Sequence, residues 1–192
     1  GGTVDKGELG TDTFTDFYES IIATNNTNDW IDGLTGGGSI ASLNIDLSNN
    51  SLTVSNLPGV GSFTSSVEGF ENVRGSNTAD QIVGDNRVNT LIGNGGNDVI
   101  DGGGGNDTLN GGAGDDTLIG GTGDDTYTFG DGIDVIDYSN LQNSITLVRG
   151  GTVDKGELGT DTFTDFYERI IATRNTNDWI DGLTGGGSIA SL

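Results

Sequence analysis

The sequence contains no cysteine, no histidine and no methionine, and only one proline among its 192 residues. The absence of cysteine and histidine excludes disulfides, thiol nucleophiles, imidazole-based catalytic triads and ordinary zinc sites. A pair of carboxyl groups could still serve a glycosidase. The glutamates Glu8, Glu19, Glu68 and Glu71, however, stand in repetitive, strand-like contexts with no recognisable cleft. We therefore predict that this chain is not an enzyme.

Basic residues are also scarce, with seven Lys and Arg against 29 Asp and Glu and a formal net charge of −22. A protein that binds nucleic acid needs a basic surface, so we expect no nucleic-acid partner. No apolar run approaches the roughly 20 residues that a membrane-spanning helix requires, so we also expect no membrane insertion.

Glycine is abundant, with 36 residues, and much of it falls in a short repeat between Gly75 and Asp137. The stretch reads as seven nonapeptides without an insertion or deletion: GSNTADQIV, GDNRVNTLI, GNGGNDVID, GGGGNDTLN, GGAGDDTLI, GGTGDDTYT and FGDGIDVID. The four from Gly93 to Thr128 carry glycine at the first and fourth places, aspartate at the sixth and a large apolar residue at the eighth. So short a unit cannot bury its apolar residue alone, which predicts that the units stack on one another.

The eighth place predicts a short strand in every unit, because a strand of three residues points its middle side chain opposite to its neighbours. Glycines at the turns allow a positive φ and leave backbone carbonyls uncovered. The residues at the eighth place are Ile82, Leu91, Ile100, Leu109, Leu118, Tyr127 and Ile136.

Stacking brings the sixth-place carboxylates close together, because rungs of β-structure lie about 4.8 Å apart. Two like charges about 4 Å apart repel by roughly 4 kcal/mol at an effective dielectric constant near 20. From Gly93 to Thr128 there are seven aspartates and no lysine or arginine to neutralise them. The stack therefore requires bound cations, and a flexible set of carboxylate and carbonyl oxygens suits Ca²⁺ better than Mg²⁺. Without calcium we expect the chain to be disordered.

GGGGNDTLN, GGAGDDTLI and GGTGDDTYT match the motif G-G-x-G-x-D-x-U-x throughout, and GNGGNDVID lacks only the second glycine. The chain thereby resembles the repeats-in-toxin (RTX), or haemolysin-type calcium-binding, family. The resemblance implies an all-β fold, a right-handed parallel β-roll (a calcium-binding β-solenoid) with two nonapeptides per coil and Ca²⁺ between successive turns. We expect segments of β-strand to lead into this roll.

The resemblance also implies which residues hold several Ca²⁺ ions. Carried onto this chain, one side of the roll holds Asp80, Asp98, Asp116 and Asp134, and the other holds Asn89, Asp107 and Asp125. Turn carbonyls would complete each shell: Asn94, Gly96, Gly103, Gly105, Gly112, Gly114, Gly121 and Gly123. Asn89 departs from the motif and Arg87 replaces a glycine, which puts a site in that turn in doubt. FGDGIDVID lacks the first glycine and is expected to cap the block.

Other interpretations of the glycine-rich stretch fit it less well. A flexible linker would not place an apolar residue at every ninth position. A phosphate-binding loop needs Gly-Lys-Ser/Thr followed by a helix, and the aspartates would repel phosphate. An EF-hand needs a twelve-residue loop that is closed by glutamate between two helices.

A second and longer repeat joins the two ends of the chain. Residues 1–43 reappear as residues 150–192 with two differences, Ser20 against Arg169 and Asn25 against Arg174. The offset of 149 residues suggests a window from a longer tandem array. We therefore divide the chain into lead-in segments with two degenerate rungs (1–74), the calcium-binding β-roll (75–137) and the start of the next unit (138–192).

The residues outside the nonapeptides also predict strands. Asn28 to Gly33 resembles a degenerate nonapeptide with Asp29 at the sixth place and Ile31 at the eighth, and the stretch from Phe70 to Gly84 has the same layout. Asp29 and its copy Asp178 are thus further candidates for binding Ca²⁺, the alternative being solvated turn acids. We also expect strands in three other stretches: Thr11–Tyr18, a pair joined by a tight turn within Ser39–Asn56, and Ser144–Val148.

These observations favour a calcium-dependent structural repeat of a large secreted bacterial surface or matrix protein. It would act as the extender of an adhesin or as the subunit of an extracellular fibre, and would fold on binding calcium after export. The alternative is an RTX secretion and folding domain attached to a toxin or a secreted hydrolase. Calcium-dependent ice binding is weaker, since threonine occurs once at the third place of the four central turns. Because strand edges at the ends of a solenoid are unpaired, head-to-tail self-association is also open.

Overall fold

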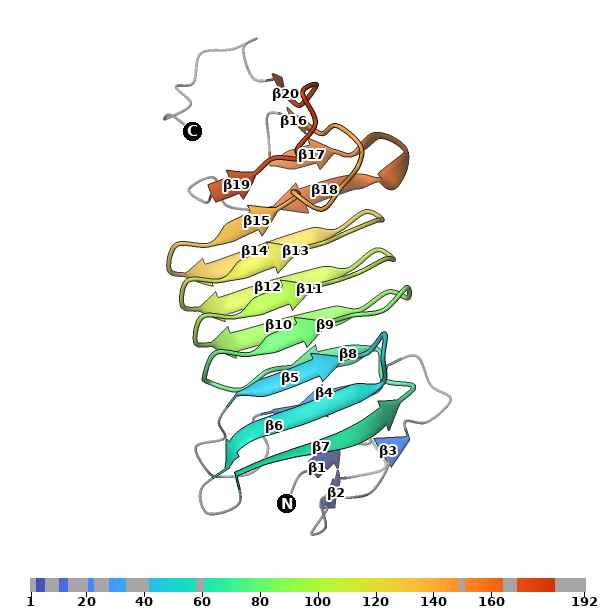
Figure 1. Ribbon diagram of the computed structural model, residues 1–192, viewed down its shortest axis with the longest axis vertical. Coiled ribbons are helices and arrows are strands. Elements are labelled where there is room, and N and C mark those ends of the chain that lie inside the picture. Colours follow the sequence, from blue (N-terminus) through green and yellow to red (C-terminus); the bar gives the residue numbers. More distant parts are fainter. Residues whose placement is uncertain are drawn as a thin grey trace.

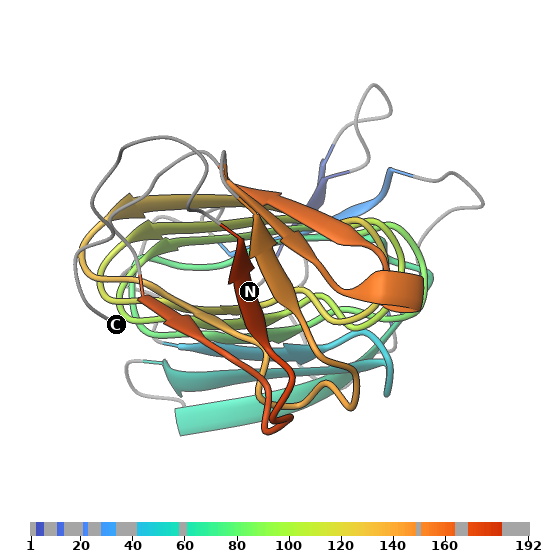
Figure 2. The ribbon, with the colours of Figure 1, turned by 90° about the horizontal axis from the view of Figure 1, so that it is seen from above.

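Stacked β-strands build most of the described part of the chain. The computed structural model describes residues 3–5, 11–13, 21–22, 28–33, 42–57, 61–148, 151–163 and 169–181. These residues form twenty strands and one short 3-10 helix, η2 (Gly156–Leu158). The strands form two sheets that face each other across a flattened coil (Figures 1 and 2). The predicted all-β parallel β-roll is thereby confirmed.

The larger sheet has eleven strands. In spatial order they are β2 (Thr11–Thr13), β1 (Thr3–Asp5), β4 (Trp30–Asp32), β8 (Asn72–Arg74), β10 (Thr90–Gly95), β12 (Thr108–Ala113), β14 (Thr126–Asp131), β18 (Thr160–Phe163), β17 (Thr152–Asp154), β16 (Thr146–Val148) and β20 (Trp179–Asp181). The smaller sheet has nine: β19 (Arg169–Ile171), β15 (Val135–Asp137), β13 (Thr117–Ile119), β11 (Val99–Asp101), β9 (Gln81–Val83), β5 (Leu43–Asp46), β6 (Ser51–Leu57), β7 (Gly61–Glu68) and β3 (Ile21–Ile22).

The nonapeptides alternate between the two sheets, so that each coil contains two of them. In the larger sheet Leu91 of β10 pairs with Leu109 of β12, which pairs with Tyr127 of β14, always in parallel register. The smaller sheet repeats this spacing of 18 residues from β9 through β11 and β13 to β15. The expectation of two nonapeptides per coil is therefore confirmed.

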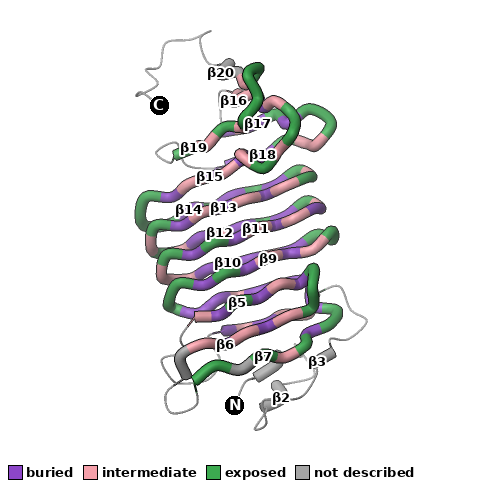
Figure 3. The backbone as a smooth tube through the Cα atoms, viewed as in Figure 1, coloured by how far each residue is buried: buried purple, intermediate pink, exposed green. Residues whose placement is uncertain are grey.

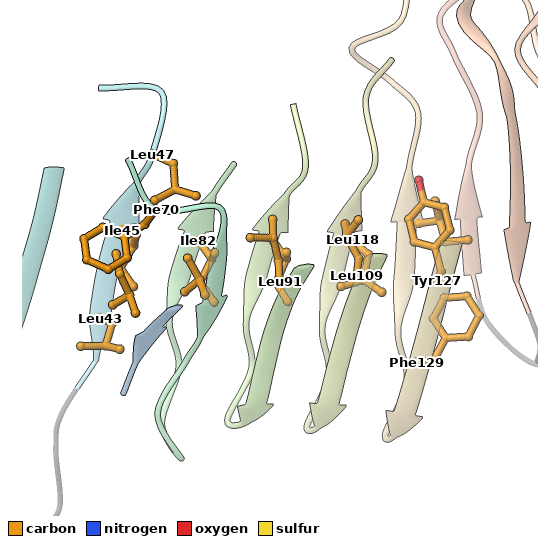
Figure 4. Packing of buried hydrophobic residues seen from close by; sticks show 14 of the residues in the cluster. Leu43, Ile45, Leu47, Phe70, Ile82, Leu91, Leu109, Leu118, Tyr127 and Phe129 are labelled. Atoms are coloured by element: carbon orange, nitrogen blue, oxygen red, sulfur yellow. The ribbon is translucent and has the colours of Figure 1, made fainter. Parts of the chain in front are cut away.

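The apolar residues at the eighth place fill the space between the two sheets. All seven have an exposed fraction of 0%, and buried residues form a continuous column through the coils (Figure 3). The close-up in Figure 4 shows Leu91, Leu109 and Tyr127 in a row from left to right, on successive coils, together with Ile82 and Leu118 from the facing sheet. This column is the hydrophobic core that a single unit could not build.

The tight turns depend on glycine at the second and fourth places. Gly112, for example, has φ +107°, and a Cβ there would collide with the carbonyl of Asn94 in the coil before. Asn94 itself occupies a second place with φ +75°. Asparagine is among the residues that tolerate this left-handed region best, which explains why the motif survives there without its glycine.

The stack continues beyond the nonapeptides through strands that are farther apart in sequence. Ile31 of β4 lies in register with Val73 of β8, and Val73 lies in register with Leu91. The two degenerate rungs that the sequence predicts are therefore present. The predicted strand pair also exists, because β5 and β6 are antiparallel and joined by a turn over residues 47–50.

At the other end the expectation that FGDGIDVID caps the block is wrong. Strand β18 lies in parallel on β14, and β19 lies in parallel on β15. Each brings an apolar residue, Phe163 opposite Tyr127 and Ile170 opposite Ile136. The chain returns to the stack at Phe163, 36 residues after Tyr127 rather than 18, and the continuous nonapeptide pattern does not extend over this detour.

The two copies of the duplicated segment pair differently although their sequences agree. In the first copy β1 pairs directly with β4, in antiparallel orientation. In the second copy β16, the predicted strand near Ser144–Val148, inserts between β17 and β20. The partner strand, and not the local sequence, thus decides the pairing. The predicted strand Thr11–Tyr18 is present as β2, and its residues beyond Thr13 lie outside the described part.

Replacing Leu109 by alanine should lower the free energy of unfolding in calcium by about 2–5 kcal/mol, because the cavity cannot be refilled by the fixed rungs above and below. Urea unfolding followed by circular dichroism measures this change. Val99→Ala is the matched control: Val99 stands at the seventh place with 41% of its surface exposed, and its loss should change stability by less than about 0.5 kcal/mol. Equal losses in both variants would contradict the buried column.

Candidate metal centre

Sixth-place carboxylates form a ladder of hydrogen bonds along one side of the roll. The Asp98 Oδ1 atom accepts the backbone N–H of Asp80 at 2.8 Å, Asp116 accepts that of Asp98 at 2.8 Å, and Asp134 accepts that of Asp116 at 2.8 Å. Each carboxylate therefore binds the turn of the preceding coil. This side contains the four acids that the sequence analysis assigned to it.

The other side carries the corresponding ladder. Asp107 Oδ1 accepts the N–H of Asn89 at 2.8 Å, and Asp125 Oδ1 accepts that of Asp107 at 3.0 Å. The ladder then continues to a residue that the sequence did not suggest, since Asp161 Oδ1 accepts the N–H of Asp125 at 3.1 Å. Asp161 lies 36 residues farther on, at the start of the returning strand β18.

The second carboxylate oxygen, Oδ2, accepts no hydrogen bond from the described residues in three of these aspartates. Asp98, Asp107 and Asp116 are each 1% exposed, and their Oδ2 atoms are buried without a hydrogen-bond partner among the described residues. A buried carboxylate oxygen that lacks a donor is costly. It is the arrangement expected where a cation completes the site.

The first glycine of a turn leaves space for this oxygen. A Cβ on Gly93 would collide with Asp98 Oδ2, and a Cβ on Gly111 would collide with Asp116 Oδ2. Glycine is favoured at the first place because the carboxylate and a backbone carbonyl of the next coil leave no room for a Cβ, and not because of the backbone angle.

A buried ammonium group shows which atoms face the same point. The Lys155 Nζ atom lies 2.9 Å from Gly121 O and 2.9 Å from Asp125 Oδ2. The carbonyl at the second place and the carboxylate at the sixth place of one turn therefore converge on a cation. The described residues contain no group of three or more Asp, Glu, His or Cys side chains suited to a metal ion. Carbonyls must supply most ligands, so the predicted set at the second and fourth places remains our proposal.

Asp80 differs from the other acids because the protein satisfies both of its oxygens. Its Oδ2 accepts the N–H of Ser76 at 2.5 Å, and its Oδ1 accepts the N–H of Leu43 at 2.6 Å and the hydroxyl of Ser76 at 3.1 Å. Ser76 and Thr78 replace the second and fourth glycines of the motif in this turn, and this substitution is the signal in the sequence.

The turn that carries Asn89 is also closed by protein groups. The Asn89 amide donates to Glu71 O at 2.8 Å, and its oxygen accepts the N–H of Asp85 at 2.9 Å. The Arg87 guanidinium pairs with Glu71 at 2.6 Å and with Asp85 at 2.8 Å. These contacts agree with the doubt that the sequence raised about a calcium site in this turn.

The two further candidates directly precede β4 and β20, outside the nonapeptides. The N–H of Asp29 donates to Glu71 Oε2 at 3.1 Å. Asp178 Oδ1 accepts the N–H of Ile145 at 3.0 Å, and both Asp178 oxygens lie 2.8 Å from the hydroxyl oxygen of Thr173. Calcium binding by Asp29 and Asp178 stays a prediction.

Burial raises the pKa of five carboxyl groups in the ladders, those of Asp80, Asp98, Asp107, Asp116 and Asp134. For Asp98 and Asp107, desolvation and the next acid along each ladder raise the pKa to about 7. Without a bound cation, these groups therefore titrate near neutral pH.

The calcium-free roll should accordingly lose stability as the pH rises from about 4 to about 7. In this range the folded chain binds protons at Asp98 and Asp107 that the unfolded chain, with a pKa near 3.8, has already released. Circular dichroism in EDTA from pH 4 to pH 8 follows the resulting loss of β-structure, and the double variant Asp98→Asn/Asp107→Asn should weaken this pH dependence. Stability that rises with pH in EDTA would contradict the assignment.

Comparison with known families agrees with this geometry. The model of the RTX calcium-binding nonapeptide repeat, which spans four copies, matches residues 74–109 and 101–136. No curated protein of known function matches the chain. Among the described residues no helix is both long and apolar enough to cross a membrane. The match covers the turns that carry the two carboxylate ladders. Residues 74–136 are therefore RTX calcium-binding nonapeptide repeats, which bind Ca²⁺ and are typical of secreted extracellular proteins.

Proposed function

We propose that this chain is a calcium-dependent structural repeat of a large secreted bacterial surface or matrix protein. It serves as the extender of an adhesin or as the body of an extracellular fibre. The observation that carries this proposal is the stacked, buried carboxylate whose Oδ2 lacks a partner, repeated at Asp98, Asp107 and Asp116. These groups lie in the stacked turns of successive coils, so a ligand bound there affects the folding of the whole roll.

The proposed mechanism couples folding to metal binding. In a bacterial cell, where free calcium is low, repulsion between the stacked carboxylates keeps the chain unfolded and ready for export. Outside the cell, extracellular calcium sites typically have dissociation constants of roughly 10⁻⁴–10⁻³ M, close to the ambient concentration. Binding then supplies the free energy of folding, because the unfolded chain has no preformed site.

The continuity of the two sheets favours the extender over a secretion domain beside a catalytic domain. Strands β18 and β19 belong to the second copy of the duplicated segment, and they lie directly on β14 and β15 of the calcium block. A following unit would thus continue the stack without a flexible linker. The division into 1–74, 75–137 and 138–192 and head-to-tail association of chains belong to this proposal. A full-length sequence with many 149-residue units would support it, and a single block beside a hydrolase would support the alternative.

Asp116→Asn tests the metal-coupled folding against its neighbour Asp115→Asn. Both changes remove one charge, but Asp116 is 1% exposed with a free Oδ2, whereas Asp115 is exposed and its Oδ1 accepts the N–H of Ile133. We expect D116N to raise the calcium concentration at the folding midpoint several-fold, and D115N to leave it within about twofold. Circular dichroism during a calcium titration from EDTA measures both.

The proposal fails if the wild-type chain has the same β-content in EDTA and in millimolar calcium. It also fails if D115N and D116N shift the midpoint equally, because a general charge effect would then explain the result.

A further inference from the structure

Lys155 is a fully buried lysine at the C-terminal end of one carboxylate ladder. It follows β17 and directly precedes η2, and its exposed fraction is 0%. Its Nζ atom has three oxygen partners: Gly121 O at 2.9 Å, Asp125 Oδ2 at 2.9 Å and Asp161 Oδ1 at 2.6 Å. An ammonium group has three N–H donors, so this set of contacts satisfies it completely.

In the last coil this ammonium group lies beside the Oδ2 atom of the sixth-place aspartate. One coil earlier, the equivalent Oδ2 atom has no hydrogen-bond partner among the described residues. Gly103 and Gly121 occupy equivalent places, because Gly104 pairs in parallel with Thr122 and the N–H of Thr122 donates to Gly103 O at 3.1 Å. Asp107 and Asp125 are equivalent in the ladder. In the earlier coil Asp107 Oδ2 has no hydrogen-bond partner, whereas in the last coil Asp125 Oδ2 has Lys155.

The surrounding contacts hold the lysine in place without help from a metal ion. The N–H of Gly123 donates to Leu158 O at 2.7 Å, and the N–H of Thr160 donates to Asp124 Oδ1 at 2.7 Å. These bonds fasten the segment between β17 and β18 onto the last turn of the calcium block.

Asp161, the acid that ends this ladder, is also saturated by protein groups. Its Oδ2 accepts the hydroxyls of Tyr127 at 3.1 Å and Tyr138 at 2.8 Å, and its Oδ1 accepts Lys155 and the N–H of Asp125. A buried charge pair is tolerated where further hydrogen bonds satisfy both partners, as they do here.

We propose that the Lys155 ammonium replaces a Ca²⁺ ion in the last turn of the Asn89–Asp107–Asp125 ladder, so that this end of the roll closes without metal. The inference rests on the calcium-binding function proposed above. At the start of the same ladder Asn89 and Arg87 take the place of the motif residues, and both are satisfied by Glu71 and Asp85. This side therefore binds calcium in its middle, at Asp107, and has protein cations at both ends. On the opposite side, the Oδ2 atoms of Asp98 and Asp116 have no hydrogen-bond partner among the described residues.

The duplicated segment extends this inference to other units. Residues 3–14 and 152–163 have the same sequence, TVDKGELGTDTF, so Lys6 and Asp12 correspond to Lys155 and Asp161. In a tandem array, the beginning of each unit would thus close the calcium block of the unit before it. The lysine would then lie at the junction between two units, at the C-terminal end of the calcium block of the earlier unit.

The number of calcium ions bound by the whole chain tests the proposal. Lys155→Ala removes the ammonium and leaves space beside Gly121 O, Asp125 and Asp161, so this variant should bind one Ca²⁺ more than the wild type. Lys6→Ala is the matched control with identical flanking sequence, and it should bind the wild-type number. The double variant Lys155→Ala/Asp125→Asn removes a ligand of the new site and should lose the additional ion. Native mass spectrometry across a calcium titration counts the ions.

Thermal unfolding provides a second measurement. At a low calcium concentration that is just sufficient to fold the wild type, K155A should unfold at a lower temperature than K6A, because Asp125 and Asp161 are left without a counter-charge. In millimolar calcium this difference should disappear, since the added ion neutralises both. If K155A gains no ion, or stays unfolded in saturating calcium, the replacement by Lys155 is wrong while the calcium function stands. If the wild type binds no calcium, the proposed function itself is wrong.

Discussion

Repulsion between stacked carboxylates is the constraint on which the rest of this structure depends. A parallel β-roll repeats each residue at the spacing of neighbouring strands, so an acid at the sixth place meets its copies in every coil. Each Oδ1 accepts a backbone N–H of the preceding coil, which stabilises the stack, but Asp98, Asp107 and Asp116 keep a buried Oδ2 that no described group satisfies. The buried oxygens thus favour bound cations, and this is why we propose that calcium binding is coupled to folding.

The hydrophobic column and the carboxylate ladders share one short repeat. The eighth-place side chains fill the interior, the sixth-place acids line the turns, and the glycines provide room for both. Because every nonapeptide contributes to all three features, the unit tolerates few substitutions in its central copies. Departures concentrate at the ends, where Ser76, Arg87 and Asn89 replace open positions with hydrogen bonds and ion pairs from the protein.

The ends of the calcium block are therefore distinct from its middle. The outer rungs come from β4 and β5 on one side and from β18 and β19 on the other, and they return to the stack after long detours along the chain. These strands cover the unpaired edges that a solenoid would otherwise expose. Lys155 adds a fixed positive charge at one of these junctions. In such a repeat, the calcium-binding coils and the junction closed by protein side chains belong to the same pair of sheets.

The resemblance to the RTX family implied the two sides of acids. The sequence by itself determined the period of nine, the apolar column from Ile82 to Ile136 and the oxygen chemistry that favours calcium. Each follows from residues at regular spacing within a continuous stretch, where a repeat translates directly into spatial position. Only the tertiary structure decided how the ends close: which strands return to the stack, that Asp161 extends a ladder, and that Lys155 lies beside Asp125. Those contacts join residues that are separated by irregular loops, and no local pattern records where a chain returns after such a detour.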